Sequence, residues 1–221
     1  MEKEEWKAAV IKAADQLREE ILAMGEEIYK HPETGYREFH TTELVADKLE
    51  KLGLKVERNI AYTGCKAVSE KKKNGPTIAV LGELDSLICM AHPDCNPENG
   101  YMHACGHNIQ VSVMYGVAAA MTRCGILDQL GGNIEFMAVP AEEYIELDYR
   151  SRLKKEGKIQ YFSGKAEAIR KGAFDDVDMA VMAHNYPISE QGYKCSPASA
   201  WNGFIGKQVR FIGKQAHAGG A

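Results

Sequence analysis

The sequence predicts an α/β protein in which a mostly parallel sheet is flanked by helices. Three short apolar runs have the length and composition of strands that are covered on both faces, namely Thr77–Leu81, Asn133–Val139 and Asp178–Ala183. Helical patterns lie between these runs, and strands that alternate with helices are typical of a parallel sheet. A chain of 221 residues is long enough for one large domain or two small ones.

Two helices are predicted before the first of these strands. Apolar residues recur at steps of three and four between Trp6 and Ile28, which predicts one long amphipathic helix. The segment HPETGYRE, residues 31–38, then interrupts the helical pattern with a proline and a glycine. A second helix follows, with the apolar residues of the segment 44–52 facing inward and with Gly53 as its stop.

The remaining elements follow the first strand. A loop rich in turn-forming residues, 92–100, leads to a helix over Ile109–Arg123. The last part of the chain is predicted to be β structure, with Lys207–Gly213 as its clearest strand. We therefore expect a first domain over residues 1–191 and the beginning of a second domain over 192–221. No closing element of this second domain follows, so we expect the sequence to be the front part of a longer protein.

Composition and charge exclude several classes of function. The formal net charge of −4 argues against nucleic acid or an anionic membrane as the main partner. The amino terminus is charged throughout and lacks the apolar stretch of a secretory signal, and no later segment is long enough to span a bilayer. The six cysteines are scattered without a CxxC pair, which indicates reduced thiols rather than a disulfide framework. We therefore expect a cytoplasmic protein.

Polar residues that can bind metal follow each of the three predicted strands. The first strand leads into Glu83 and Asp85, the second into Glu142 and Glu143, and the third into His184. Because ligands usually bind at the carboxyl ends of the strands of an open α/β sheet, we expect these side chains to line one rim. Adjacent acids are also common in solvated loops, and a lone histidine at a strand end is often a structural residue.

The segment HACGHN, residues 103–108, lies at the start of a predicted helix. Asn108 is a suitable N-cap for a helix that begins at Ile109, which places Cys105 and His107 just before the amino terminus of that helix. The helix dipole favours a thiolate there, and a bound cation favours it further. Taken alone, the segment is open to two interpretations. It is either a metal site or a buried turn, with the cysteine as a small apolar residue.

Together, these segments resemble the M20 family of metallopeptidases and amidohydrolases. The resemblance is strongest to the amidohydrolase branch, which contains aminoacyl-amide and aminobenzoyl-glutamate hydrolases. HACGH followed by PAEE in this order is the specific signature. The resemblance spans nearly the whole chain, through GELDS at 82–86, HACGHN at 103–108, VPAEE at 139–143, AFDDVDMAVMAH at 173–184 and FIGKQAHAGGA at 211–221.

The resemblance implies a hydrolase with two divalent metal ions, zinc or manganese, in a catalytic α/β domain. It also implies an inserted α+β lid domain that mediates homodimerisation. The implied substrate is a small N-acyl or aminoacyl amino acid whose amide or peptide bond is attacked by water. The implied roles are Cys105 as the ligand shared between the metals, His107, Glu143 and His184 as further ligands, Glu142 as the general base, Asp85 as the acid that orients a ligand histidine, and His217 as the lid histidine that reaches toward the substrate.

The sequence departs from the family pattern at three points. Asn108 stands where many relatives have aspartate, and Glu83 stands where other branches have a metal-binding histidine. Both residues suit the amidohydrolase branch, but they leave the identity of the metal open. The family takes a last metal ligand, a histidine, from near its carboxyl terminus, and the sequence ends before that point.

Two other functions are compatible with these residues. In a cysteine hydrolase, Cys105 would attack the substrate with His103 or His107 as its base, which leaves the glutamate pair and His184 without a purpose. A non-catalytic relative, or an inactive fragment, would keep only a structural metal. His217 is, in the simplest interpretation, a turn residue before a pair of glycines. Metal content measured beside amide hydrolysis separates these possibilities.

Overall fold

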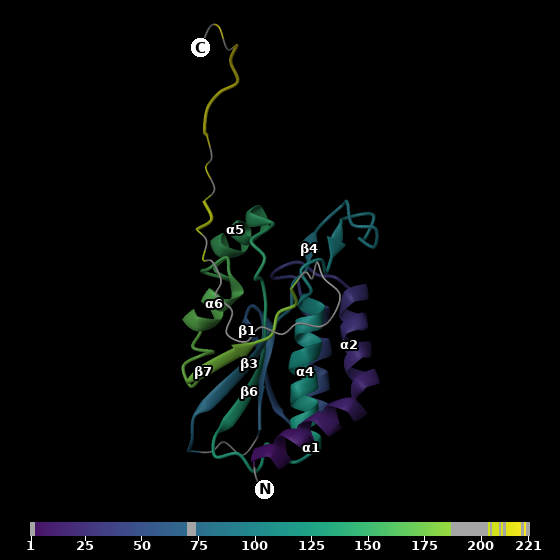
Figure 1. The fold of residues 1–221 in the computed structure, drawn as a ribbon. Coiled ribbons are helices and arrows are strands. Elements are labelled where there is room, and N and C mark those ends of the chain that lie inside the picture. Colours follow the sequence, from purple (N-terminus) through teal and green to yellow (C-terminus); the bar gives the residue numbers. More distant parts are fainter. Residues whose placement is uncertain are drawn as a thin grey trace. The chain divides into compact units, whose positions relative to one another are not determined.

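The computed structural model describes residues 3–69, 74–186, 203, 205–207, 209, 211–217 and 219. The chain divides into two compact units, Met1–Tyr186 and Pro187–Ala221, and all helices and strands of the described residues lie in the first unit (Figure 1). The domain predicted over 192–221 falls within the second unit, and its identity as a lid stays a prediction. Of the strand predicted over Lys207–Gly213, residues 208 and 210 lie outside the described part, and the described residues are in no strand.

The first unit contains a main sheet, a small two-stranded sheet and six helices among its described residues. The helices are α1 (Lys3–Gln16), α2 (Arg18–Lys30), α3 (Phe39–Lys51), α4 (His107–Arg123), α5 (Leu147–Lys155) and α6 (Gly164–Arg170). The strands are β1 (Lys55–Ala61), β2 (Thr63–Val68), β3 (Thr77–Glu83), β4 (Leu87–Ile88), β5 (Tyr101–Met102), β6 (Asn133–Val139) and β7 (Met179–Met182).

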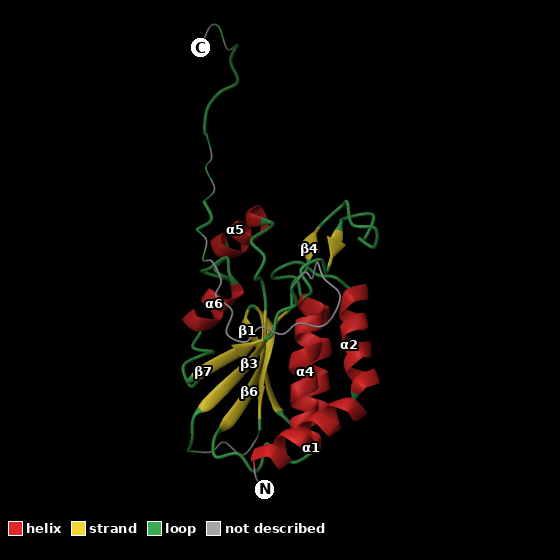
Figure 2. Ribbon diagram, in the orientation of Figure 1, coloured by secondary structure: helices red, strands yellow, loops and turns green. Residues whose placement is uncertain are grey.

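The main sheet confirms the predicted α/β class, and its strand order is β1-β2-β6-β3-β7. The three predicted strands are β3, β6 and β7, and they are parallel neighbours. The hairpin of β1 and β2, which was not predicted, joins β6 in antiparallel pairing and makes the sheet mixed. Helices α1 to α4 lie on one side of the sheet and α6 on the other (Figure 2). Because β3, β6 and β7 are parallel, their carboxyl ends meet at one edge of the sheet.

The prediction that β7 is covered on both faces is wrong. All four of its residues are exposed, and Met179 and Val181 keep more than half of their surface accessible. The physical reason is its position. Strand β7 pairs only with β3, at the edge of the sheet, and in the described part of the chain no helix covers it. Its apolar composition matches the buried strands, so the sequence pattern does not reveal the difference.

The single long helix predicted at the amino terminus is divided in two at Leu17. This residue is buried and leaves helical backbone geometry, with φ of −93° and ψ of 3°. Helix α2 runs beside α4, whereas α1 crosses its lower end (Figure 1). A straight helix could not make both contacts, so packing against α4 explains the bend. No helix among the described residues has both the length and the apolar character needed to cross a bilayer.

The main core lies between the helices α1 to α4 and the sheet, and Phe136 is one of its largest completely buried side chains. Phe136 lies on β6, is completely buried and pairs in register with Ala67 on one side and Val80 on the other. We expect Phe136→Ala to lower the free energy of unfolding by about 3–5 kcal/mol, because it leaves a cavity in a close-packed core. Urea denaturation measures this, with Phe39→Ala as the control because the Phe39 ring is half exposed. Equal losses in the two variants would contradict this view of the core.

Candidate metal centre

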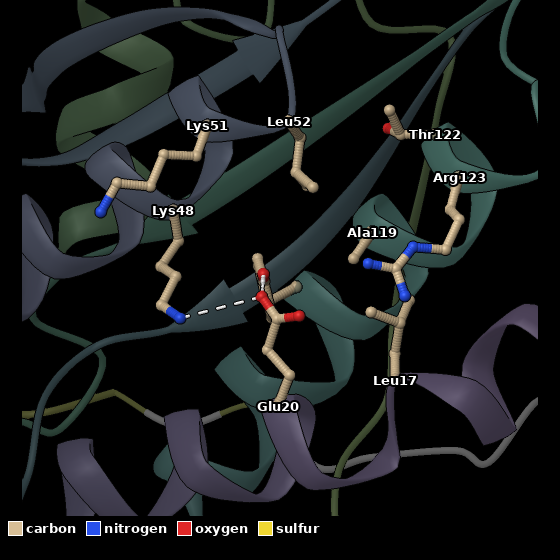
Figure 3. Close-up of a pocket in the computed structure, with 9 residues that line it drawn as sticks. Leu17, Glu20, Lys48, Lys51, Leu52, Ala119, Thr122 and Arg123 are labelled. Atoms are coloured by element: carbon tan, nitrogen blue, oxygen red, sulfur yellow. Dashed lines mark hydrogen bonds and ion pairs between the residues drawn. The ribbon is translucent and has the colours of Figure 1, made fainter.

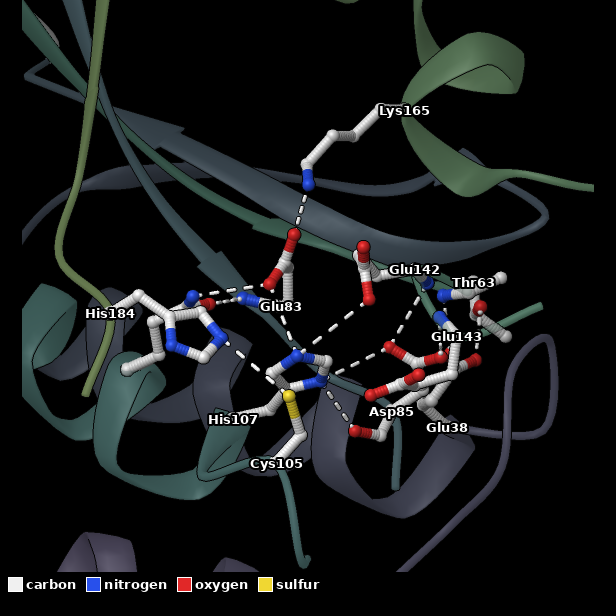
Figure 4. A network of polar contacts seen from close by, with 12 residues as sticks. Glu38, Thr63, Glu83, Asp85, Cys105, His107, Glu142, Glu143, Lys165 and His184 are labelled. Carbon is white, nitrogen blue, oxygen red and sulfur yellow. Dashed lines mark hydrogen bonds and ion pairs between the residues drawn. The ribbon is translucent and has the colours of Figure 1, made fainter. Parts of the chain in front are cut away.

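The predicted site residues of the first unit gather at the carboxyl ends of β3, β6 and β7 (Figure 4). Glu83 is the last residue of β3, and Asp85 follows two residues later. Strand β6 ends at Val139, so the glutamate pair lies three residues beyond it, and His184 lies two residues beyond the end of β7. The loop that contains Cys105 leads into α4 at the same edge. The predicted rim is therefore present.

His107 is at the centre of this group, and its ring is almost completely buried. Its Nδ1 donates a hydrogen bond to the backbone carbonyl of Asp85 at 2.7 Å and lies 3.4 Å from Oδ1 of the same residue. Its Nε2 lies 3.1 Å from a carboxylate oxygen of Glu83 and 3.9 Å from one of Glu142, without hydrogen-bond geometry to either. With the proton held on Nδ1, the lone pair of Nε2 is available to a cation.

The predicted start of α4 is wrong by two residues. The helix begins at His107, and its N-cap is Gly106, which has the left-handed φ of 89°. The left-handed backbone angle favours glycine, and an added Cβ would also force the side chain of Asn185 to move, because it would lie 2.2 Å from its Oδ1. Asn108 is therefore not the cap. It lies within the helix, and its Nδ2 donates to the carbonyl of Gly25 at 3.2 Å.

Two groups of potential metal ligands share His107. In the first group, the ligand atoms of Cys105, His107 and His184 all lie within 4.8 Å of one another, and Cys105 Sγ is 3.6 Å from His184 Nε2. In the second group, the same limit holds for Glu83, His107 and Glu142. The resemblance instead gives the shared position to Cys105, which stays a prediction. Neither group includes the carboxylate of Glu143, so its predicted role as a ligand also stays a prediction.

The charges around His107 favour a cation. Burial lowers the pKa of His107, but its hydrogen bond to Asp85 and its contacts with Cys105 and Glu83 outweigh burial, so the pKa is raised. Burial raises the pKa of Glu83, but the contacts with His107 and Lys165 lower it by more, so the net pKa is about 2. The acids around His107 therefore stabilise positive charge at this point, and a metal ion bound to Nε2 would replace the proton. A thiol, two imidazoles and carboxylates in such a site fit a divalent cation.

Glu142 has the environment of a proton acceptor. One third of its side chain is exposed, and its carboxylate faces His107. Burial, together with the nearby charges of Glu83 and Glu143, raises the pKa of Glu142 above its ordinary value. A carboxylate with a raised pKa takes a proton more readily than one in water, which suits a general base.

Asp85 connects the histidine to the glutamate pair. Its carboxylate oxygens accept hydrogen bonds from the backbone N–H groups of Glu142 at 3.0 Å and Glu143 at 2.9 Å (Figure 4). The same residue contacts Nδ1 of His107. Its implied role of orienting a ligand histidine stays a prediction, and the contacts with the glutamate backbone are a second feature that sequence reasoning missed.

Several other polar residues at the site were not predicted. The side chains of Gln110 and Lys165 both contact the carboxylate of Glu83, and Gln110 Oε1 also accepts the Glu83 backbone N–H at 2.6 Å. Glu38 and Arg150 contact the backbone around the glutamate pair. None of these residues follows a predicted strand, so the pattern that revealed the others could not reveal them.

His103 and His107 were the possible bases for Cys105 in a cysteine hydrolase, and the structure shows the surroundings of both. His103 is buried, and neither of its ring nitrogens has a hydrogen-bond partner in the described residues. Burial, and then the charge of His107, lowers the pKa of His103 to about 4. The sulfur of Cys105 lies within 4.8 Å of a ring nitrogen of His107 and is 3.6 Å from Nε2 of His184, a histidine that was not named as a base. His217 belongs to the second unit, where its Nδ1 accepts the backbone N–H of Gly219 at 3.1 Å, as in a turn.

A separate pocket of about 360 Å³ is lined by residues of α2, α3 and α4 (Figure 3). Its charged side chains include Lys48, Lys51 and Arg123, with Glu20 paired to Lys48 at 3.8 Å. None of the predicted catalytic or metal-binding residues lines it. The pocket is therefore distinct from the candidate metal centre.

Comparisons with known sequences show which family the chain is similar to. The sequence model described as peptidase family M20/M25/M40 matches residues 79–197. One of the subunits of p-aminobenzoyl-glutamate hydrolase from Escherichia coli is 32% identical over 177 residues, which cover 76% of this chain and 32% of that protein. The N-acetyl-L-cysteine deacetylase of Bacillus subtilis is 26% identical over 208 residues, which cover 91% of this chain and 45% of that protein.

Solved structures show the same fold. The Bacillus subtilis YXEP protein, described as a dinuclear metal binding peptidase from the M20 family, matches with a TM-score of 0.62 and 23% identity, over 78% of this chain and 44% of that chain. An aminobenzoyl-glutamate utilization protein from Klebsiella pneumoniae matches with a TM-score of 0.56 and 19% identity, over 77% and 44%. The chain spans between about a third and a little over half of the length of the curated relatives it matches.

Proposed function

The chain belongs to peptidase family M20/M25/M40, and on this premise we propose that the whole protein is a metal-dependent amidohydrolase. It hydrolyses an amide or peptide bond in a small N-acyl or aminoacyl amino acid and uses two divalent metal ions, zinc or manganese. The observation that carries the proposal is the convergence of Cys105, His107 and His184 on one point beside the glutamate pair. Three ligands of these types are the usual number at a catalytic zinc.

Cys105, His107 and His184 would hold one metal, and Cys105 with Glu143 would contribute to the second. Thiolate and imidazole ligands favour zinc, whereas carboxylates also accept manganese. Bound there, a divalent cation polarises the amide carbonyl and lowers the pKa of water toward 7. The buried Asp85 keeps the His107 ring oriented through Nδ1.

Glu142 acts as the general base in this proposal. Its carboxylate takes a proton from the attacking water and then delivers it to the leaving amine. The raised pKa of Glu142 and its position beside His107 support this role. Asp85 also accepts the backbone N–H of Glu143, the next residue of the same turn, whose side chain is the proposed metal ligand.

The substrate classes to test follow from the names of the relatives, which include aminobenzoyl-glutamate and N-acetyl-L-cysteine. We propose a screen of the whole protein, supplied with Zn²⁺ or Mn²⁺, against N-acyl amino acids, dipeptides and aminobenzoyl-glutamate. Release of free amine from at least one class is the expected result. If none of these compounds is cleaved with either metal, the proposed reaction is wrong.

One observation favours a second function. The 3.6 Å approach of Cys105 Sγ to His184 Nε2 is also the arrangement of a thiol nucleophile and its base. This cysteine hydrolase leaves no role for Glu142 or for the ligand arrangement around His107. Alkylation of the thiol and chelation of metal separate the two functions, because only a metallohydrolase loses activity on chelation alone.

Loss of the His217 side chain is expected to lower kcat by about 10²–10³-fold without changing metal content. The proposed reason is that the lid histidine donates a hydrogen bond to the oxyanion that develops on the scissile carbonyl. The measurement compares His217→Ala with His40→Ala, which removes an exposed histidine from α3. If the kinetics of His217→Ala match those of wild type, His217 has no role in catalysis, and its hydrogen bond with Gly219 only stabilises a turn.

We further propose that the protein is a cytoplasmic homodimer that associates through the second unit. The cysteines that the structure describes are all free, which fits a reducing compartment. The name of the Escherichia coli relative designates it as one part of an assembly. Light scattering of the whole protein measures the oligomeric state, and a monomer at micromolar concentration would contradict the dimer.

A further inference from the structure

The turn that carries the glutamate pair has a backbone conformation that needs support. Ala141, between Pro140 and Glu142, has a φ of 53°, in the left-handed region that residues with a Cβ rarely adopt. Such a conformation persists only where the surroundings hold it, and it is common at functional sites. The question is which groups hold this turn.

Buried ionisable side chains accept hydrogen bonds from, or donate them to, successive backbone groups of the turn. Oε1 of Glu38 accepts the N–H of Ala141 at 2.8 Å, and Asp85 accepts the N–H groups of Glu142 and Glu143. The guanidinium of Arg150 donates to the carbonyl of Glu143 through Nη2. Three ionisable residues from separate segments therefore bind one three-residue turn.

Glu38 is itself fixed on both sides. It lies just before α3, is completely buried, and accepts the hydroxyl of Thr63 through its second oxygen at 2.8 Å (Figure 4). Burial, and then the charge of Asp85, raises the pKa of Glu38 to about 8. Burying a carboxyl group near a second acid costs free energy unless its oxygens are hydrogen-bonded. Apolar packing therefore does not explain why Glu38 is buried here, whereas its hydrogen bonds do.

Arg150 is fixed in a similar way from α5. It is completely buried, and its Nη1 donates to the carbonyl of Phe162 at 2.7 Å. Its guanidinium lies 5.6 Å from the centre of the Tyr36 ring. A Cβ on residue 35 would lie 2.2 Å from Nη2 of Arg150. The glycine at this position therefore leaves room for the guanidinium group. The segment 35–38 therefore accommodates Arg150 and also supplies the carboxylate of Glu38.

We propose that Glu38 and Arg150 are positioning residues that hold the backbone of Ala141 to Glu143 and thereby aim the carboxylate of Glu142. This inference rests on the proposed function of Glu142 as the general base. Glu38 holds the start of the turn, Arg150 holds its end, and Asp85 holds the two N–H groups between them. Neither Glu38 nor Arg150 belongs to a group of potential metal ligands among the described residues, so neither is expected to bind a metal itself.

A double-mutant cycle in the whole protein tests the coupling to Glu142. We expect Glu38→Ala to lower kcat by roughly 10- to 100-fold, with KM and metal content within about twofold of wild type, because a small misplacement of a reacting group is costly. Glu38→Gln should recover most of the rate, since its amide oxygen still accepts the Ala141 N–H and its NH₂ group can donate to Thr63. In the Glu142→Gln background, Glu38→Ala should have little further effect.

The control is Glu135→Ala, which removes another buried acid, this one from the middle of β6, where it is paired with Lys66. A merely structural role for Glu38 predicts lower thermal stability in Glu38→Ala and Glu135→Ala alike, with kcat per folded molecule unchanged. That result would overturn the proposal. An equal loss of kcat with and without Glu142 would also overturn it.

Hydrogen exchange tests the same inference without any activity. We expect the amides of Ala141, Glu142 and Glu143 to exchange at least about tenfold faster in Glu38→Ala and in Arg150→Lys, which keeps the charge but loses the planar fork. Amides in the middle of α4 should be unchanged in both variants. If wild-type protein hydrolyses none of the substrates, the proposed function fails while this measurement still decides the positioning role. Unchanged exchange at residues 141–143 in both variants would refute it.

Discussion

Glu142→Gln is expected to lower kcat by roughly 10²–10⁴-fold while the protein keeps its metal. The glutamine side chain has the same shape as glutamate but cannot accept the proton of the attacking water. The backbone N–H of residue 142 still bonds to Asp85, so the turn keeps its geometry. Amine release measures kcat, and elemental analysis of the same sample measures bound metal per chain.

Glu143→Gln is the matched comparison, because it makes the same chemical change one residue later in the same turn. Its backbone is held by the same aspartate, so any difference reflects the side chains. We expect this variant to lose metal affinity as well as turnover, since Glu143 is the proposed ligand. Equal metal loss in both variants would show that the roles within the pair are assigned wrongly. This test matters because the structure places Glu142, and not Glu143, in a group of potential ligands.

The parallel part of the sheet could be predicted from the sequence because its strands are short, almost continuous apolar runs. The hairpin of β1 and β2 could not, since Lys55–Ala61 mixes charged and apolar residues and only its last two residues are buried. The division of the amino-terminal helix at Leu17 has no proline or glycine to mark it. It follows from packing of both halves against α4, which local patterns do not contain.

The rim of the site could be predicted because its residues follow strands directly. Glu38 and Arg150 lie more than 100 residues apart in sequence, and they meet at Ala141 to Glu143 only in the folded chain. In sequence, Glu38 resembles an ordinary acid before a helix, and Arg150 resembles a surface cation in the charged segment of α5. Their complete burial is a tertiary property. Asn108 shows the opposite failure, because a good capping residue lies inside a helix whose start is set by Gly106.

Removal of metal is expected to abolish hydrolysis completely. His107 offers Nε2 toward the other ligands while Asp85 holds Nδ1, and the surrounding acids favour positive charge at this point. Without a cation, the water has no Lewis acid and Glu142 has no activated proton to remove. The cysteine hydrolase makes the opposite prediction, because Cys105 and His184 need no metal.

The most direct test measures hydrolysis and bound metal on the same samples of the whole protein. The protein is dialysed against a chelator until metal is absent by elemental analysis, and Zn²⁺ or Mn²⁺ is then added back in steps. The proposed function predicts no hydrolysis at zero metal and a rate that rises with the amount of metal bound. Hydrolysis that persists in the metal-free protein and disappears on alkylation of Cys105 would contradict it.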